Sequence, residues 1–142
     1  MKGWAEPRAE RIVIEDVRPN VNAGRYPVKR IVGEALDVRA SIIKEGHDVL
    51  QAEVELWQGE QSILSLPLAH DVATDDWHAG LLLDVPPGTY AYRIVTWTDT
   101  YGSWLEEFRR KVGARADVES EALQGVSLIR AAAASADGKR AL

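Results

Sequence analysis

The stretch from Pro86 to Phe108, PPGTYAYRIVTWTDTYGSWLEEF, constrains the fold of this chain more than any other. Pro86 to Thr89 is a turn signal, and the residues after it alternate between two faces, as those of a β-strand do. Ser103 and Glu106 then fit a capping box, in which the serine side chain accepts a backbone hydrogen bond and the glutamate reaches back. The stretch therefore predicts a change from sheet to helix.

The residues before this stretch carry the signals of a β-sandwich. The cleanest alternation runs from Glu34 to Lys44, with Leu36, Val38, Ala40 and Ile42 on one face. Turn signals recur at intervals of roughly 8–12 residues, which is the spacing of a sandwich. The spacing Gly88-x-Tyr90-x-Tyr92 is typical of the tyrosine corner and points both tyrosines toward the core. We therefore predict a mainly β chain, with an immunoglobulin-like β-sandwich of six to seven strands followed by two C-terminal helices. The predicted strands cover residues 11–17, 34–44, 50–58, 62–68, 77–85 and 90–98.

The pattern changes to helical periodicity after residue 99. Trp104, Leu105, Phe108 and Val112 share one stripe of a first helix, and a second helix is predicted from Asp117, as its cap, to about Ala134. These patterns divide the chain into four segments. We expect a flexible lead-in over 1–10, the sandwich over 11–99, a helical insertion segment over 100–134, and a disordered or truncated tail over 135–142.

Composition narrows the classes of function. The net charge of −5 argues against a general nucleic-acid binder, which would normally carry a basic excess. The absence of cysteine excludes disulfides, thiolate metal sites and a thiol nucleophile. The N-terminus lacks the apolar run of a signal peptide, and the sequence has no apolar stretch near the ~20 residues of a membrane span. We expect a cytoplasmic protein with neither a nucleic-acid nor a membrane partner.

The sequence contains no arrangement typical of an active site. His47, His70 and His78 lie in different segments without the spacing of metal ligands. A nucleophile elbow and a phosphate-binding glycine loop are also missing from it. We therefore expect no catalytic residue, no metal and no cofactor in this chain.

Two groups of residues are candidates for an interface or a ligand-proximal surface. The first is the loop from Arg18 to Arg30, which is basic and has no acidic residue between positions 18 and 33; its candidate members are Arg25, Tyr26, Lys29 and Arg30. These cations either pair with nearby acids on a solvated loop or meet an anionic group or an acidic partner. The second group is Trp57, Val95 and Trp97, which point outward from the predicted sheet. Tryptophan stacks on sugar rings, but burial under the helices or at a subunit interface is the competing interpretation.

Several segments together resemble a known family. They are RIVIEDVRPNVNAGRYPVKRIVGE, EGHDVLQAEVELW, DDWHAG, PPGTYAYRIVTWTDTYGSW and RRKVGARADVESEALQGVSLI, and they span residues 11 to 134. The most specific are the Gly24–Arg30 run, the Gly46-His47-Asp48 turn and the Trp97-x-Asp99…Trp104 signature. The chain resembles the N-terminal domain of alpha-1,4-glucan:maltose-1-phosphate maltosyltransferase, the GlgE type of bacterial glucan synthesis in the alpha-amylase superfamily.

The resemblance implies a non-catalytic role for this chain. It implies a parent enzyme that transfers maltosyl units from maltose-1-phosphate to alpha-1,4-glucan with retention, as a retaining glycosyltransferase. Its catalytic carboxylates would belong to a separate barrel, so no catalytic residue is carried onto this sequence. The implied partners are that catalytic barrel and a second subunit in a homodimer, and the implied role is assembly. The alternative is an independent carbohydrate-binding module that recognises alpha-glucan through exposed tryptophan.

The resemblance also leads to an expectation about the sheet. If the parent chain returns from the helices to supply more sheet, the strand over Tyr90–Thr98 has an unfinished edge here. Such edges recruit other chains, so we expect self-association through that edge or through Val95 and Trp97.

Overall fold

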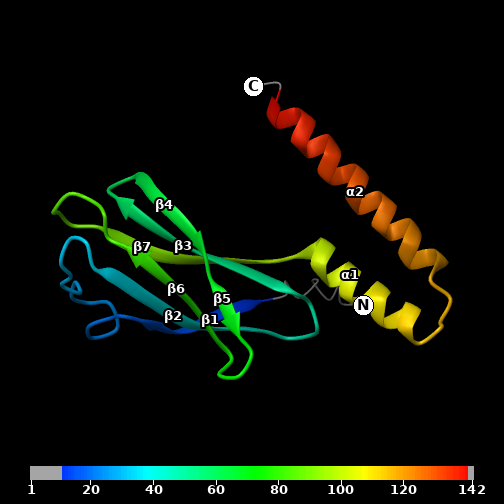
Figure 1. Cartoon of the computed structure of the whole chain (residues 1–142), viewed down its shortest axis with the longest axis horizontal. Coiled ribbons are helices and arrows are strands. Elements are labelled where there is room, and N and C mark those ends of the chain that lie inside the picture. Colours follow the sequence, from blue (N-terminus) through cyan, green and yellow to red (C-terminus); the bar gives the residue numbers. More distant parts are fainter. Residues whose placement is uncertain (1–10, 141–142) are drawn as a thin grey trace, which may run out of the picture. The chain divides into compact units, whose positions relative to one another are not determined.

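The computed structural model describes residues 11–140, and the lead-in predicted over residues 1–10 lies outside this range. The chain divides into two compact units. One comprises Met1–Gly46 and Leu50–Trp97, and the other His47–Val49 and Thr98–Leu142. The first unit contains the strands and the second the helices (Figure 1).

The first unit is a sandwich of two antiparallel sheets. One sheet has the order β1-β2-β6-β5 and the other β4-β3-β7. The prediction of a mainly β chain, an immunoglobulin-like sandwich followed by two helices, is confirmed. The seven strands are β1 (Ile12–Arg18), β2 (Ala35–Lys44), β3 (Leu50–Gln58), β4 (Gln61–Pro67), β5 (Ala69–Asp71), β6 (Asp76–Leu82) and β7 (Ala91–Thr98).

The strand β5 is a correction to the sequence prediction, which placed residues 70 and 71 in a loop. Pro67 is the last β4 residue paired with β3, and proline has no backbone N–H to add to that ladder. Buried Leu68 then donates its backbone N–H to Ala52 O at 2.8 Å. The next three residues pair with β6 in the other sheet, so one short linker joins the two layers (Figure 1).

The core forms from the alternating faces of three strands. Leu36, Val38, Ala40 and Ile42 of β2 are all buried, as the period-two pattern predicted. The buried residues of β3 and β6 meet them from the facing and the neighbouring strand. Val38, Val54 and Leu81 are the largest side chains that are fully buried.

The tyrosine corner is present as predicted. The Tyr90 hydroxyl donates to the carbonyl of Pro86 at 2.7 Å, four residues back along the chain. The Tyr92 hydroxyl donates to the carbonyl of Pro19, which ties β7 to the loop that follows β1. Both rings pack against the core and remain only half-buried.

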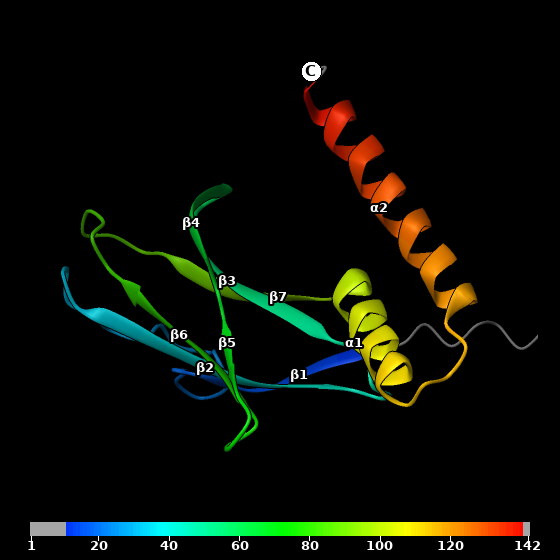
Figure 2. The ribbon, with the colours of Figure 1, turned by 45° about the vertical axis from the view of Figure 1, so that its right-hand side comes forward.

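The second unit contains α1 (Thr100–Gly113) and α2 (Glu119–Arg140), and the chain reverses direction between them (Figure 2). The predicted cap of α1 was wrong. The N-cap is Asp99, whose side chain accepts from the backbone N–H of Gly102 at 2.8 Å. Ser103 lies inside the first turn, where its Oγ accepts from the backbone N–H of Val49 at 2.8 Å.

The predicted start of α2 agrees with the structure and the predicted end does not. The Asp117 side chain accepts from the backbone N–H of Glu119 at 3.1 Å, as a cap does. The helix continues to Arg140 instead of ending near Ala134. Four consecutive alanines, the best helix formers, precede Ser135, whose hydroxyl bonds back to Ala131 O at 3.0 Å. The tail expected from residue 135 is therefore helical up to residue 140.

Trp104 and Gly125 hold the two helices together. Trp104 donates its indole N–H to Glu121 O at 2.6 Å and stacks on Phe108, with 5.3 Å between ring centroids. A Cβ at position 125 would lie 2.1 Å from the indole ring, so only glycine permits this contact. Lys111 adds ion pairs with Glu121 and, at 3.3 Å, with Glu107.

We predict that Gly125→Ala separates the helices. In an exposed helix, replacing glycine by alanine would stabilise the helix by about 1 kcal/mol. Here the methyl group would collide with the rigid indole ring, so we expect lower helicity by circular dichroism and a shift in tryptophan fluorescence. Gln124→Ala, at the neighbouring exposed position, is the control and should leave both signals unchanged. A more helical Gly125→Ala variant would contradict the prediction.

Candidate functional site

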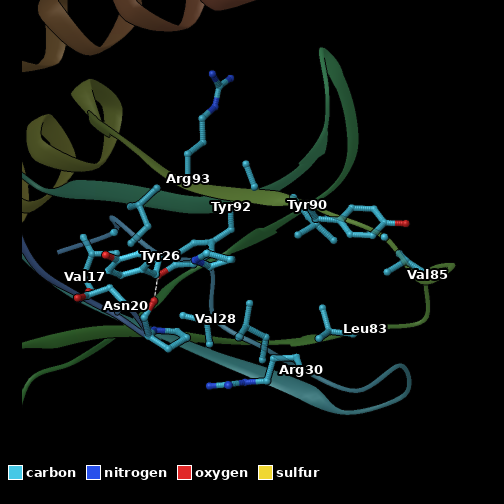
Figure 3. Close-up of a pocket in the computed structure, with 18 of the residues that line it drawn as sticks. Val17, Asn20, Tyr26, Val28, Arg30, Leu83, Val85, Tyr90, Tyr92 and Arg93 are labelled. Atoms are coloured by element: carbon cyan, nitrogen blue, oxygen red, sulfur yellow. Dashed lines mark hydrogen bonds between the residues drawn. The ribbon is translucent and has the colours of Figure 1, made fainter. Parts of the chain in front are cut away.

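A cavity of about 1020 Å³ lies between the two sheets where β1 and β7 form their edges (Figure 3). Its walls come from β1, the loop between β1 and β2, the turn before β7, and β7 itself. Most of the side chains around it are aliphatic or aromatic; they include Val17, Val28, Leu83, Val85, Tyr26 and Tyr92. An apolar opening of this size is large for a sandwich core, which normally packs without voids.

Tyr92 supplies a polar group to this cavity. Burial raises the pKa of its phenol above the ordinary value of 10.0, and the positive charge of Arg30 opposes that rise. The hydroxyl therefore stays protonated and donates to Pro19 O, the bond drawn in Figure 3. This bond fixes the loop after β1 against β7.

The basic loop is internally ordered. A bridge joins Val21 to Tyr26, and Arg25 donates its backbone N–H to Asn22 O at 3.1 Å. The turn between them uses positive φ at Asn22, Ala23 and Gly24. Within residues 11–140, no carboxylate forms an ion pair with Arg25, Lys29 or Arg30. Arg25 instead lies 5.8 Å from the centroid of the Tyr26 ring, and Arg30 donates to Lys29 O at 2.8 Å.

The same loop exposes large apolar side chains. Ile31 is 69% exposed and Tyr26 is 54% exposed, and both line the cavity. Val21 and Val32 are also exposed. Monomeric proteins rarely expose a large contiguous apolar patch. Such a patch is therefore typical of an interaction surface.

A second cluster lies on the outer face of the three-stranded sheet. Glu55 accepts from the indole N–H of Trp57 at 2.8 Å and from the guanidinium of Arg93. The guanidinium carbon of Arg93 lies 4.3 Å from the centroid of the Trp57 ring, a cation–π contact. The hydrogen bond from Arg93, and then the one from Trp57, hold the pKa of Glu55 below its ordinary value of 4.5. Arg93 points away from the cavity toward this face (Figure 3).

Sequence reasoning singled out Trp57 and missed Glu55 and Arg93. Alternation places Glu55 on the face of Trp57, and Arg93 on the face of Val95 and Trp97, so the sequence predicts which face of its strand each residue occupies. The sequence does not predict that β3 pairs with β7, because the pairing and register of strands depend on tertiary structure.

The structure does not bring Trp57 and Trp97 together. Arg93 contacts Glu55, while the Thr96 hydroxyl donates to Gln51 O at 2.9 Å, so the two strands run in opposite directions. Trp97 therefore lies near the start of β3 and Trp57 near its end, about 20 Å apart at ~3.4 Å per residue. Trp97 is 44% exposed, and Val95 is half-buried.

The helical unit presents an apolar surface that the sequence analysis did not single out. Leu123 is 67% exposed, Ile129 is 55% exposed and Val126 is 45% exposed, all on α2. Among the described side chains of residues 98–136, none is a buried hydrophobic residue. The signal was present in the sequence, since these apolar residues recur every three positions.

Within the described part of the chain, no group of three or more histidine or acidic residues is placed to hold a metal ion. Neither α1 nor α2, over the residues described, is long and apolar enough to cross a membrane.

The fold and these surfaces define an immunoglobulin-like domain with a helical extension. The chain belongs to the family described as alpha-1,4-glucan:maltose-1-phosphate maltosyltransferase, domain N/S, whose model matches residues 10–142. It is 38% identical over 133 residues to the enzyme of that name from Myxococcus xanthus, covering 91% of this chain and 20% of the relative. The Salinibacter ruber enzyme is 32% identical, covering 93% and 20%. The Pseudomonas aeruginosa enzyme is 38% identical, covering 84% and 18%. The chain thus spans about a fifth of the length of these relatives.

We predict that Glu55 makes stability depend on acidic pH. Because its pKa is lower in the folded chain than in the unfolded chain, its contribution is complete above about pH 4.5 and is lost as the pH falls through the lowered value. Glu55→Gln should lower the urea midpoint at pH 7 and lose less stability than the parent on acidification to about pH 3.

The control for this prediction is Glu53→Gln, two residues earlier on the same face. It should leave the acid dependence of the urea midpoint unchanged. Equal acid dependence of the parent and the Glu55→Gln variant would contradict the assignment.

Proposed function

We propose that this chain is the non-catalytic N-terminal assembly domain of a cytoplasmic, retaining maltosyltransferase that transfers maltosyl units from maltose-1-phosphate to alpha-1,4-glucan. Membership of the family supports the parent activity, because the relatives carry this name. This chain spans about a fifth of the length of the relatives. This share supports the proposal that the catalytic residues belong to another part of the parent polypeptide.

The exposed apolar face of α2 is the observation that carries the assembly role. Leu123, Val126 and Ile129 together present a hydrophobic strip on a helical unit in which no side chain described over residues 98–136 is a buried hydrophobic one. Burial of such a strip against another protein surface is favourable by roughly 25 cal/mol per Å² of apolar area. A second subunit is the partner we propose for this face, and the catalytic barrel is the second proposed partner of the domain.

The sandwich contributes further candidate contacts. Arg25, Lys29 and Arg30 present positive charge beside exposed apolar groups, a combination suited to an acidic partner surface. Val95 and Trp97 offer an apolar contact on the opposite side of β7.

The alternative, an independent carbohydrate-binding module, has less support from the geometry. A sugar platform needs an accessible aromatic face, and Arg93 covers one face of Trp57 while Glu55 occupies its N–H. The separation of about 20 Å between Trp57 and Trp97, at ~3.4 Å per residue, also keeps them from stacking on neighbouring rings of one glucan.

We predict that Leu123→Asp combined with Ile129→Asp dissociates the homodimer of the maltosyltransferase polypeptide that carries this chain. Two charges in an apolar interface must be desolvated, so the dimer dissociation constant should rise by about 10-fold or more. Light scattering coupled to gel filtration measures the change. Ser127→Asp, at an exposed polar position of α2, is the control and should remain dimeric; an unchanged double variant would overturn the assignment of this face.

We also predict that the isolated chain gives no saturable change in tryptophan fluorescence when titrated with maltoheptaose. Arg93 already covers one face of the Trp57 ring, and Trp97 alone offers a single stacking surface. A saturable response that disappears in Trp57→Ala or Trp97→Ala would favour the binding module over the assembly domain.

A further inference from the structure

The start of α1 is bonded to the turn between β2 and β3. Val49 donates its backbone N–H to Ser103 Oγ at 2.8 Å, and its carbonyl accepts from the backbone N–H of Asp99, also at 2.8 Å. Residues 47–49 accordingly belong to the same compact unit as the helices. These contacts join two of the most specific signatures of the sequence, Gly46-His47-Asp48 and Trp97-x-Asp99…Trp104.

The observed start of α1 depends on Asp99 and on the glycine three residues after it. The Asp99 carboxylate accepts from the backbone N–H of Gly102 at 2.8 Å, and the Asp99 carbonyl accepts from the backbone N–H of Ser103 at 2.9 Å. A Cβ at position 102 would lie 2.7 Å from the carboxylate, so another residue there would displace the cap. Threonine and glycine are weak helix formers, so these bonds, rather than intrinsic propensity, hold the first turn in the helix.

The sequence encodes a second start one turn later. Ser103 and Glu106 have the spacing of a capping box, in which the serine Oγ accepts from the N–H of the third helical residue and the glutamate reaches back to the serine N–H. In the structure, Ser103 lies inside the helix and bonds to Val49 instead. Glu106 is exposed, and its carboxylate forms no hydrogen bond or ion pair with another residue of 11–140. Glu106 is therefore available to complete the box.

The two roles of Ser103 exclude each other. A cap residue leaves the helical conformation, and its Oγ turns toward the N–H of residue 106, so it no longer accepts from Val49. We propose that α1 has two alternative starts: the start at Asp99 binds the turn between β2 and β3, and the start at Ser103 releases it. Trp104 keeps its bond to Glu121 O in both states, because it becomes the first residue of the shorter helix.

This exchange is a conformational device that couples the turn to the helical unit. His47 and Asp48 are exposed, so a partner can reach the turn. A contact that draws Val49 away from Ser103 favours the later start of α1, and by reciprocity the later start favours that contact. The device lies within this chain and does not depend on the proposed function.

The test is hydrogen exchange at the backbone amide of Val49, measured by NMR on this chain. The Val49 N–H is bonded to Ser103 and not to the Asp99 carboxylate, so its rate in Asp99→Ala reports the change of start. We expect exchange at Val49 to be faster by about 10-fold or more in Asp99→Ala, while the amides of residues 108–112 keep the parent rate. Asp99→Asn retains a capping side chain and should exchange as the parent does.

Glu106 separates a second start from simple fraying of the first turn. Adding Glu106→Ala to Asp99→Ala removes the competing box, so the Val49 amide should return toward the parent rate. Glu106→Ala alone should slow Val49 exchange by about 2-fold or more, because it removes the state in which this amide is released. Arg109→Ala, at an exposed position one turn further along α1, is the matched control and should change neither rate.

Two outcomes would overturn the proposal. An unchanged Val49 rate in Asp99→Ala would show that loss of the cap does not release the turn. A fast Val49 rate that persists when Glu106→Ala is added would show fraying without a second start. If Asp99→Ala loses protection throughout α1, the single Glu106→Ala variant decides, because it leaves every observed bond of Asp99, Ser103 and Val49 in place. An unchanged or faster Val49 rate in that variant would then contradict the proposal.

Discussion

Interdigitation of the inner faces of β2, β3 and β6 is the constraint on which the sandwich depends. Val38, Val54 and Leu81 are fully buried, and each comes from a different strand. Because strand side chains alternate between faces, burying one residue of each strand fixes the direction of all its neighbours. The outward position of Glu55 and Trp57 on β3 follows from the burial of Val54 between them in this packing.

How far the fold can be predicted from the sequence depends on the range of the interaction involved. The buried face of Glu34–Lys44 was predictable because period-two alternation is a local signal. The cap of α1 was not, because Asp99 and Ser103 are both good cap residues and the choice depends on where the preceding strand ends. The strand β5 escaped prediction because three residues carry no periodicity and it exists only through its pairing with β6.

The candidate surfaces show the same limit. Composition alone identified the basic loop, and alternation identified Trp57, Val95 and Trp97 as outward residues. The contact of Arg93 with Trp57 depends on a register between strands that are more than thirty residues apart in the sequence. The cavity was harder still to predict from the sequence, because it forms where the inward-facing residues of the two sheets leave space unfilled.

The two units leave surfaces that require different kinds of partner. The edge of β7 has directional backbone groups, so it is satisfied only by an extended segment that supplies complementary N–H and C=O groups. The strip formed by Leu123, Val126 and Ile129 belongs to a helix whose backbone bonds are already made, so it is satisfied by side-chain packing alone. One partner element cannot meet both requirements. The described residues therefore present two surfaces that suit chemically different contacts, backbone pairing along β7 and side-chain packing along α2.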